Sequence, residues 1–276
     1  MYLRPRRLDE ALAALAERPR PILAGGTDFY PARVGRPPED DVLDLTAVAE
    51  LRGIERTPEG VRIGATTTWS EILDAPLPAS LAALKLAARE VGGVQIQNAG
   101  TVAGNLCNAS PAADGIPVLL ALGARVELRS AAGRRVLPIG EFVLGSQRTA
   151  LRPDEIVIAI DIPPWAEGAR STFLKLGARR YLVISIAMVA AVVEPDESRR
   201  VGRAAIAVGA CSPVARRLPA LEAALVGRPC DVALGAAVEA RHLALLAPIT
   251  DVRGTAEYRR DAVMTLVRRA IETAAA

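Results

Sequence analysis

Lysine, histidine and aromatic residues are scarce in this chain of 276 residues, and the scarcity of histidine excludes a class of function. The only lysines are Lys85 and Lys175, the only histidine is His242, and aromatic residues make up 3% of the sequence. One histidine is too few for multi-histidine metal sites and for most acid–base schemes built on histidine. We therefore expect any chemistry to come from a cofactor, and His242 to be a helix-surface or packing residue.

Cysteines are also few, and they are widely spaced. Cys107, Cys211 and Cys230 do not form the clusters that iron–sulfur centres and structural zinc sites need. Their odd number disfavours a disulfide framework and suits a reducing cytoplasm. The first residues lack a secretory-signal pattern, and the longest uncharged apolar run, 181–193, is shorter than the roughly 20 residues that span a bilayer. We expect a cytoplasmic chain with no membrane partner.

Charge gives no sign of a nucleic-acid partner. The sequence has 34 Lys and Arg against 31 Asp and Glu, and this net charge of +3 is scattered along the chain. Pairs such as Arg179–Arg180 are typical of solvated edges rather than of a basic stripe. The hydrophobic content of 51% indicates a folded protein with a substantial core, in two domains or one elaborate domain.

The apolar spacing changes in character part-way along the chain. The first part reads as short mixed units. Helices are predicted at 8–15, 81–91 and 116–122, and a short helix starts at Trp69, after a capping box formed by Thr68 and Glu71. Strands are predicted at 21–24, 41–45, 61–65, 125–129 and 155–162. After Pro163–Pro164 come strands at 171–176, 185–193 and 201–208, then helices at 216–226, 231–246 and 255–273. Consecutive strands with tight connections predict an antiparallel sheet backed by helices. We place a domain boundary near residue 168.

A glycine pair ends the strand at 21–24, in the sequence AGGTD at 24–28. Successive amides after such a turn can form a concave nest that attracts an anion such as pyrophosphate, and a plain turn is the competing interpretation. The glycines do not fit the GxGxxG spacing of a Rossmann site, and the prolines at 31, 37 and 38 prevent the long helix that such a site needs. Asp44 is therefore interpreted as a strand-end residue, not a ribose ligand.

The most distinctive segment is GTVAGNLCNASPAAD at 100–114, which directly precedes the apolar helical run. Gly100 and Gly104 allow the backbone to come close to another molecule. Short polar side chains accompany them, at Thr101, Asn105, Asn108, Ser110 and Asp114. The pattern predicts a ligand-facing loop that binds phosphate or sugar without a basic side chain.

These motifs resemble the FAD-binding subunit of the molybdenum hydroxylases, the group of xanthine dehydrogenases, carbon monoxide dehydrogenase medium subunits and their relatives. The resemblance covers essentially the whole chain, with further matching segments at 117–124, 155–163, 173–180 and 256–260. It implies an α+β protein with a FAD-binding PCMH-type domain at 1–168, made of two α/β subdomains at about 1–55 and 56–168. A C-terminal α/β domain with an antiparallel sheet and helices would occupy 169–276.

The resemblance also implies which residues contact FAD. Residues 22–29 would wrap the pyrophosphate, with the amides of Gly25, Gly26 and Thr27 nearest. Thr101, Gly104 and Asn105 would hold the phosphates from the other side. The whole implied set is Ile22, Leu23, Ala24, Gly25, Gly26, Thr27, Asp28, Phe29, Thr101, Val102, Ala103, Gly104, Asn105, Asp114, Val157, Lys175 and Tyr181. No catalytic residue and no metal ligand is expected in this chain.

Four members of this set have specific expected roles. Asp114 would anchor the cofactor through a hydrogen bond, and Val157 would pack near the isoalloxazine. Lys175 would lie near the polar edge of the ring, where a cation stabilises the anionic reduced flavin; a snorkelling surface lysine is the alternative. Tyr181 would cover one face of the ring, with core packing as the competing interpretation.

The function that the resemblance implies is electron transfer, not hydroxylation. A large partner subunit would hold molybdopterin and oxidise the substrate, and a small partner would relay electrons through two [2Fe-2S] clusters. FAD in this chain would pass the electrons to NAD⁺ or another acceptor. The alternatives are a free-standing flavin oxidase or reductase of the same fold, and a non-enzymatic protein with an inactive nucleotide site.

Overall fold

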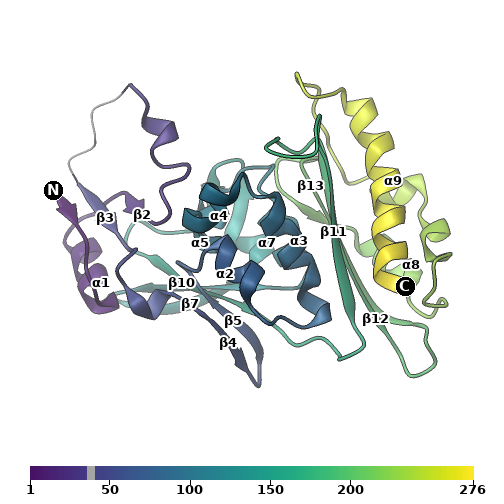
Figure 1. The fold of residues 1–276 in the computed structure, drawn as a ribbon, viewed down its shortest axis with the longest axis horizontal. Coiled ribbons are helices and arrows are strands. Elements are labelled where there is room, and N and C mark those ends of the chain that lie inside the picture. Colours follow the sequence, from purple (N-terminus) through teal and green to yellow (C-terminus); the bar gives the residue numbers. More distant parts are fainter. Residues whose placement is uncertain (36–40) are drawn as a thin grey trace.

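The computed structural model describes residues 1–35 and 41–276. Pro37 and Pro38, which were predicted to prevent a helix, lie outside these residues. The three larger sheets follow one another along the chain and along the long axis of the molecule, with helices between and beside them (Figure 1). This arrangement confirms the predicted mixed α+β fold. In the described part of the chain no helix is both long and apolar enough to cross a membrane.

The N-terminal unit is a small parallel sheet with strand order β1-β3-β2. Its elements are β1 (Tyr2–Leu3), α1 (Leu8–Glu17), β2 (Ile22–Leu23), a 3₁₀ turn η1 (Pro31–Arg33), β3 (Val42–Asp44) and η2 (Ala49–Leu51). The leucines of α1 recur at helical spacing and are buried against β3. This packing places the end of β2, where the glycine pair follows, at the inner edge of the unit.

The central unit is an antiparallel five-stranded sheet with strand order β4-β5-β10-β6-β7. Its strands are β4 (Ile54–Thr57), β5 (Gly60–Gly64), β6 (Arg125–Ser130), β7 (Gly133–Pro138) and β10 (Ile156–Ile162). Its helices are α2 (Trp69–Asp74), η3 (Ala79–Leu81), α3 (Ala82–Glu90), α4 (Val94–Ala99), α5 (Val102–Asn108), α6 (Gly115–Ala121) and α7 (Ile139–Phe142). A short hairpin of β8 (Val143–Gly145) and β9 (Arg148–Thr149) completes it.

A β-bulge in β10 joins the N-terminal and central units. The pairing of β10 with β6 shifts between Val157 and Ala159. Ile156 and Ile158 consequently pack against the N-terminal unit, whereas Ile160 packs into the core beneath the central helices. A regular strand would point these isoleucines to one face, so the bulge allows a single strand to serve two cores.

The C-terminal unit is an antiparallel sheet covered on both faces. Its elements are β11 (Arg170–Leu176), β12 (Ala187–Pro195), β13 (Val201–Gly209), β14 (Arg216–Arg217), α8 (Pro219–Leu225), η4 (Leu234–Ala237), η5 (Ala240–Leu243) and α9 (Ala256–Ala275). Met188, Ala190 and Val192 face the central helices, while Val189 and Val193 face α8 and α9. Burial on both faces explains why β12 is a continuous apolar run without polar alternation.

Three predicted elements differ in the structure. Residues 100–114, predicted as a loop, contain the helix α5. The predicted helix at 216–226 begins as strand β14 and becomes helical only from Pro219, whose fixed φ suits a first turn. The predicted helix at 231–246 is wrong, because this segment forms only the two short turns η4 and η5.

Tertiary packing accounts for the lost helix at 231–246. A Cβ added at Gly235 would lie 2.3 Å from Oε1 of Glu272, so η4 packs closely against α9. The apolar residues of this segment are buried against α9 through these short turns, so a long amphipathic helix is not needed to bury them. His242 is 4% exposed and its Nδ1 accepts a hydrogen bond from the Glu239 amide, which agrees with a packing role.

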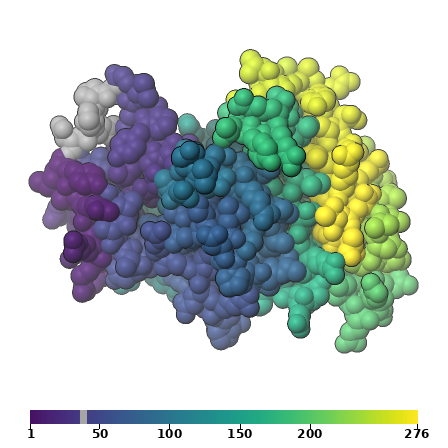
Figure 2. Space-filling view, in the orientation of Figure 1, coloured from purple at the N-terminus to yellow at the C-terminus, as the bar shows by residue number. Residues whose placement is uncertain are grey.

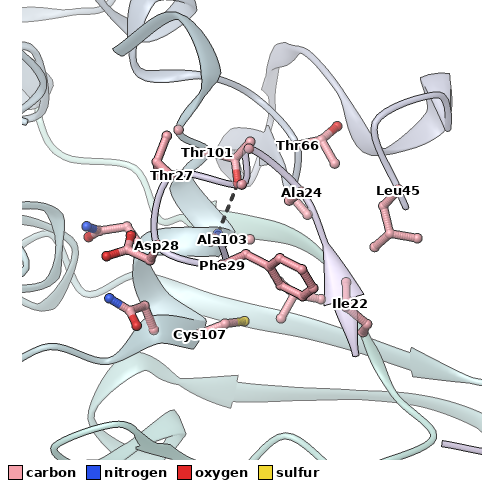
Figure 3. A pocket seen from close by; sticks show the side chains of 18 of the residues that line it. Ile22, Ala24, Thr27, Asp28, Phe29, Leu45, Thr66, Thr101, Ala103 and Cys107 are labelled. Atoms are coloured by element: carbon pink, nitrogen blue, oxygen red, sulfur yellow. Dashed lines mark hydrogen bonds between the residues drawn. The ribbon is translucent and has the colours of Figure 1, made fainter. Parts of the chain in front are cut away.

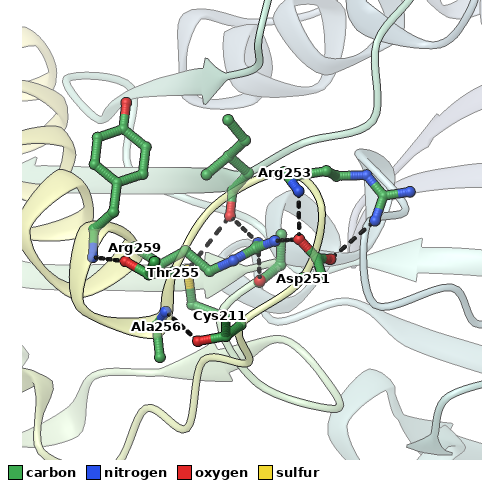
Figure 4. A network of polar contacts seen from close by, with 10 residues as sticks. Cys211, Asp251, Arg253, Thr255, Ala256 and Arg259 are labelled. Carbon is green, nitrogen blue, oxygen red and sulfur yellow. Dashed lines mark hydrogen bonds and ion pairs between the residues drawn. The ribbon is translucent and has the colours of Figure 1, made fainter.

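A buried guanidinium holds the first turn of α9 in place (Figure 4). Arg259 is 2% exposed and donates hydrogen bonds to the carbonyl oxygens of Ile186 at 2.5 Å and Ala210 at 3.1 Å, and to Oδ1 of Asp251 at 2.7 Å. These contacts connect α9 to the start of β12 and the end of β13. The charge of Arg259 is thus paired with Asp251 inside the C-terminal unit.

Candidate functional site

A cavity of about 350 Å³ lies between the N-terminal unit and the helices of the central unit. Figure 2 shows the surface notched between the N-terminal lobe and the loop that joins β11 to β12. The cavity brings together most of the residues that the resemblance implied, namely Ile22, Ala24, Gly25, Gly26, Thr27, Asp28, Phe29, Thr101, Ala103, Gly104, Asn105 and Val157. The remaining members of that set, Leu23, Val102, Asp114, Lys175 and Tyr181, are not part of its lining.

Gly25 brings the two motif segments into direct contact. A Cβ added at this position would lie 2.0 Å from the carbonyl oxygen of Ala99, which no side chain could tolerate. Gly26 has φ +74°, a left-handed conformation that favours glycine. The glycine pair is therefore needed both for the turn and for the close approach of residues 24–28 to residues 99–101.

The backbone amides of residues 25–29 have no hydrogen-bond partner in the described part of the chain. The carbonyl oxygens of Gly26 and Asp28 accept from the amides of Tyr30 and Ala32, so the chain turns on itself just beyond this row. A run of unpartnered N–H groups at a cavity wall is suited to bind an anion.

The first amides of α5 already have partners, unlike those of residues 25–29. Thr101 caps the helix by accepting from the Gly104 amide at 3.1 Å, and its carbonyl oxygen accepts from Asn105 at 3.0 Å. The Val102 amide donates to the carbonyl of Thr67. The predicted amide nest therefore fits the segment after the glycine pair, and residues 101–105 contribute shape and side chains instead.

Asn105 supplies an unsatisfied acceptor at the cavity. Its Oδ1 is buried and has no hydrogen-bond partner among the described residues. A Cβ added at Gly115 would lie 2.9 Å from this oxygen, so the amide is packed against α6. Buried polar atoms without partners are rare in folded proteins, and a ligand with a hydroxyl or N–H group would satisfy this one.

The site also contains residues that the sequence reasoning missed. Figure 3 shows the Phe29 ring near Ile22, with Thr66 and Thr101 on other walls of the cavity. Thr66 and Trp69 belong to the segment after β5, and Arg33 comes from η1. In the sequence, the only signal for Arg33 is its position four residues after the aromatic Phe29, a spacing at which two side chains can meet in a helical turn.

Asp114 and Lys175 form a buried ion pair beside the cavity, outside its lining. Nζ of Lys175 lies 3.0 Å from Oδ2 of Asp114 and also donates to the carbonyl of Glu90. Ser185 donates to the other carboxylate oxygen at 3.1 Å. Burial raises the pKa of Asp114 to about 6, while Lys175 and Ser185 act in the opposite direction. Lys175 is thus a buried, paired cation and not a snorkelling surface lysine.

Tyr181 lies on the loop that joins β11 to β12 and is 60% exposed, which excludes core packing. The guanidinium of Arg180 lies 5.2 Å from the centre of its ring. The neighbouring Leu182 approaches α4, because a Cβ added at Gly93 would lie 3.3 Å from Leu182 Cδ2. The loop therefore contacts the part of the central unit that forms one wall of the cavity.

Asp44 is not part of the cavity lining, whereas Cys107 lines the cavity with a thiol whose pKa is raised. Asp44 accepts hydrogen bonds from the hydroxyl of Tyr2 and the amide of Thr46, as expected of a strand-end residue. Burial in the cavity wall raises the pKa of the Cys107 thiol to about 12. Within residues 1–35 and 41–276, no group of three or more His, Cys, Asp or Glu side chains could hold a metal ion.

Two family models match consecutive parts of the chain. Residues 1–165 match the FAD binding domain in molybdopterin dehydrogenase. Residues 172–274 match the CO dehydrogenase flavoprotein C-terminal domain.

Several relatives match this chain over nearly its full length and over nearly their own full length. A putative xanthine dehydrogenase FAD-binding subunit of Escherichia coli K12 is 31% identical, over 100% of this chain and 96% of the relative. The nicotine 6-hydroxylase medium subunit of Paenarthrobacter nicotinovorans is 32% identical, over 100% and 97%. Among solved structures, a CO dehydrogenase from Oligotropha carboxidovorans superposes with a TM-score of 0.91 at 29% identity, covering 99% of this chain and 96% of the other.

Proposed function

Because the chain belongs to the family of FAD-binding flavoprotein subunits of molybdopterin dehydrogenases, we propose that it transfers electrons through FAD bound in this cavity. It accepts them from [2Fe-2S] clusters of a small partner subunit and passes them to NAD⁺ or another acceptor. A large partner subunit holds the molybdopterin and oxidises the substrate. Residues 1–168 hold the cofactor, and residues 169–276 close over its flavin end.

The row of unpartnered amides at residues 25–29 carries this proposal. FAD has a diphosphate in the middle of an extended molecule, and a row of N–H groups in a cavity wall can satisfy its oxygens. The orphaned Oδ1 of Asn105 fits a hydroxyl of the same ligand. The buried oxygen of Asn105 is costly without a partner, and a ligand that donates a hydrogen bond to it offsets this cost.

The other cavity residues shape the surroundings of the cofactor. FAD supplies the electron-carrying chemistry when bound. Ile156 and Val157, brought to the wall by the bulge in β10, exclude water from the site. At the side of the C-terminal unit, Asp114 anchors the cofactor, Lys175 contributes positive charge near the flavin and Tyr181 covers one face of the ring.

The names of the relatives support a complex of several subunits. The nicotine 6-hydroxylase protein is a medium subunit, and a 30% identical relative from Hydrogenophaga pseudoflava is a carbon monoxide dehydrogenase medium chain. All three cysteines of this chain are free, which supports a location in the reducing cytoplasm.

The visible spectrum of the purified protein tests the assignment of the cavity. After addition of FAD and gel filtration, we expect the two absorption bands of an oxidised flavin to stay with the protein. Gly26→Asp places a carboxylate next to the amide row and should abolish them. Gly227→Asp is the matched control, because Gly227 has nearly the same φ, +77°, and open space around it.

Flavin retained in Gly26→Asp, or absent from the wild-type chain in its assembled complex, would contradict the assignment. The acceptor is tested separately by stopped-flow spectroscopy. We expect the substrate-reduced complex to regain its oxidised flavin bands rapidly when NAD⁺ is added. Reoxidation by oxygen or an artificial acceptor alone would identify a different acceptor.

A further inference from the structure

The cavity assigned to FAD has little charge of its own. Among the described residues that line it, only Asp28 and Arg33 carry a full charge. The FAD diphosphate brings negative charge to this site, whereas backbone amides offer only partial positive charge. A guanidinium at the amide row would add a full positive charge and a planar fork that matches two phosphate oxygens, which backbone amides cannot supply.

Arg33 is positioned at the end of that row. Its Nη1 donates to the carbonyl oxygen of Phe29 at 3.0 Å, which places the guanidinium next to the last of the unpartnered amides. The carbon of the guanidinium lies 3.6 Å from the centre of the Phe29 ring. The side chain is half-buried and lines the cavity, although it belongs to η1 and not to the glycine turn.

Stacking on Phe29 also orders the guanidinium before a ligand arrives. A free arginine side chain loses rotamer entropy when it is fixed on a ligand. Here the ring and the Phe29 carbonyl already restrict the side chain. The planar fork of an arginine can in addition donate two parallel hydrogen bonds to phosphate oxygens.

We infer that Arg33 is a cofactor-binding residue that supplies the positive charge for the FAD diphosphate, and that Phe29 orients it. The inference rests on the proposed function and adds a charged contact to the amide row. It assigns an aromatic residue, Phe29, and a basic residue, Arg33, to one diphosphate-binding unit that follows the AGGTD segment. The contact selects ligands that carry a diphosphate.

Titration of flavin-free protein with three ligands tests this assignment. FAD, ADP and riboflavin separate the diphosphate from the flavin ring, since ADP carries only the diphosphate side and riboflavin carries no phosphate. The variants are Arg33→Met, which keeps an apolar stem, and Arg33→Lys, which keeps the charge but loses the fork. Arg269→Met is the control, because Arg269 is exposed on α9 and the charge change is identical.

We expect Arg33→Met to raise the Kd for FAD and for ADP by about 10-fold or more at low salt, and to leave the Kd for riboflavin unchanged. Raising the salt concentration should weaken FAD binding in the wild type and much less in Arg33→Met. Arg33→Lys should restore the salt dependence and part of the affinity. Arg269→Met should behave as the wild type with all three ligands.

Equal weakening of riboflavin and FAD would overturn the inference, because it would show a structural role of Arg33. Unchanged ADP binding in Arg33→Met would overturn it as well. Thermal unfolding of the flavin-free variants separates a folding defect from a binding defect. A wild-type protein that binds none of the flavins, alone or in its complex, would instead refute the proposed function on which the inference rests.

Discussion

The cavity at the Gly25–Gly26 turn and the buried cluster around Asp114 are both rich in polar groups, but they differ in how these groups are satisfied. In the cavity, the amides of residues 25–29 and the side-chain oxygen of Asn105 have no partner in the described structure. In the cluster, Lys175 and Ser185 of the C-terminal unit both donate hydrogen bonds to Asp114 of the central unit.

The difference separates groups that a ligand can satisfy from groups that already satisfy one another. A buried polar atom without a partner, such as Oδ1 of Asn105, costs free energy in the unliganded protein, and a ligand that pairs with it removes this cost. In the cluster, removing one buried charge leaves its partner uncompensated. Substitutions in the cavity should therefore act mainly on ligand affinity, whereas substitutions in the cluster should first lower stability.

Gly25→Ala is expected to have the largest effect on binding. Its Cβ would overlap the Ala99 carbonyl at 2.0 Å and force residues 24–28 away from residues 99–101. We expect the Kd for FAD to rise by about 100-fold or more, which corresponds to at least ~2.7 kcal/mol. Gly140→Ala is the control, since the nearest atom to its added Cβ is 3.6 Å away. Flavin retention by Gly25→Ala would show that the close contact is not needed.

Lys175→Met should have the largest effect on stability. It leaves Asp114 without its cation, and the expected loss at pH 8 is roughly 3–5 kcal/mol in the free energy of unfolding. Denaturant unfolding measures the loss. Lys85→Met is the control, because Lys85 is the other lysine and makes no ion pair in the described structure; it should cost less than about 1 kcal/mol.

The pH dependence of this loss follows from the raised pKa of Asp114. In the folded protein the pKa is about 6, above the usual 3.8, so the charged form is disfavoured by folding. The unfavourable contribution is absent below the usual value and grows as the pH rises through the folded-state value. Lys175 lowers the pKa of Asp114, so Lys175→Met raises that pKa further, and the penalty of the substitution should be smaller at pH 5 than at pH 8. A penalty that is the same at both pH values, or that Asp114→Asn does not relieve, would contradict this account.

Cys107→Ala should have the smallest effect, although Cys107 lines the cavity. With its pKa raised to about 12, the thiol has a thiolate fraction on the order of 10⁻⁴ at pH 8. In the wild-type protein, we expect alkylation of Cys107 by iodoacetamide, measured by peptide mapping, to be at least about 100-fold slower than alkylation of an exposed cysteine. In Cys107→Ala, the Kd for FAD should differ from the wild-type value by less than about 2-fold. Rapid alkylation that FAD blocks would show that the cavity also holds a reactive group.

Local sequence signals predicted the elements that stabilise themselves locally. The apolar spacing of α1 and α9, the glycine pair after β2 and the capping box of Thr68 and Glu71 all have the predicted form. Each depends on contacts within a few residues of the chain. The missed elements, such as α4, β7 and the turns η4 and η5, depend on packing against distant segments.

The sequence by itself determined the family, the α+β class and the two motif segments that meet at the cavity, because these features reside in residue types at fixed spacing. Only the tertiary structure decided which polar groups are free. It paired Lys175 with Asp114 and brought Arg33 to the cavity wall. It gave partners to the first amides of α5 and, within the described part of the chain, gave none to the amides of residues 25–29. Hydrogen-bond satisfaction is a property of the whole fold, since a partner can come from any part of the chain.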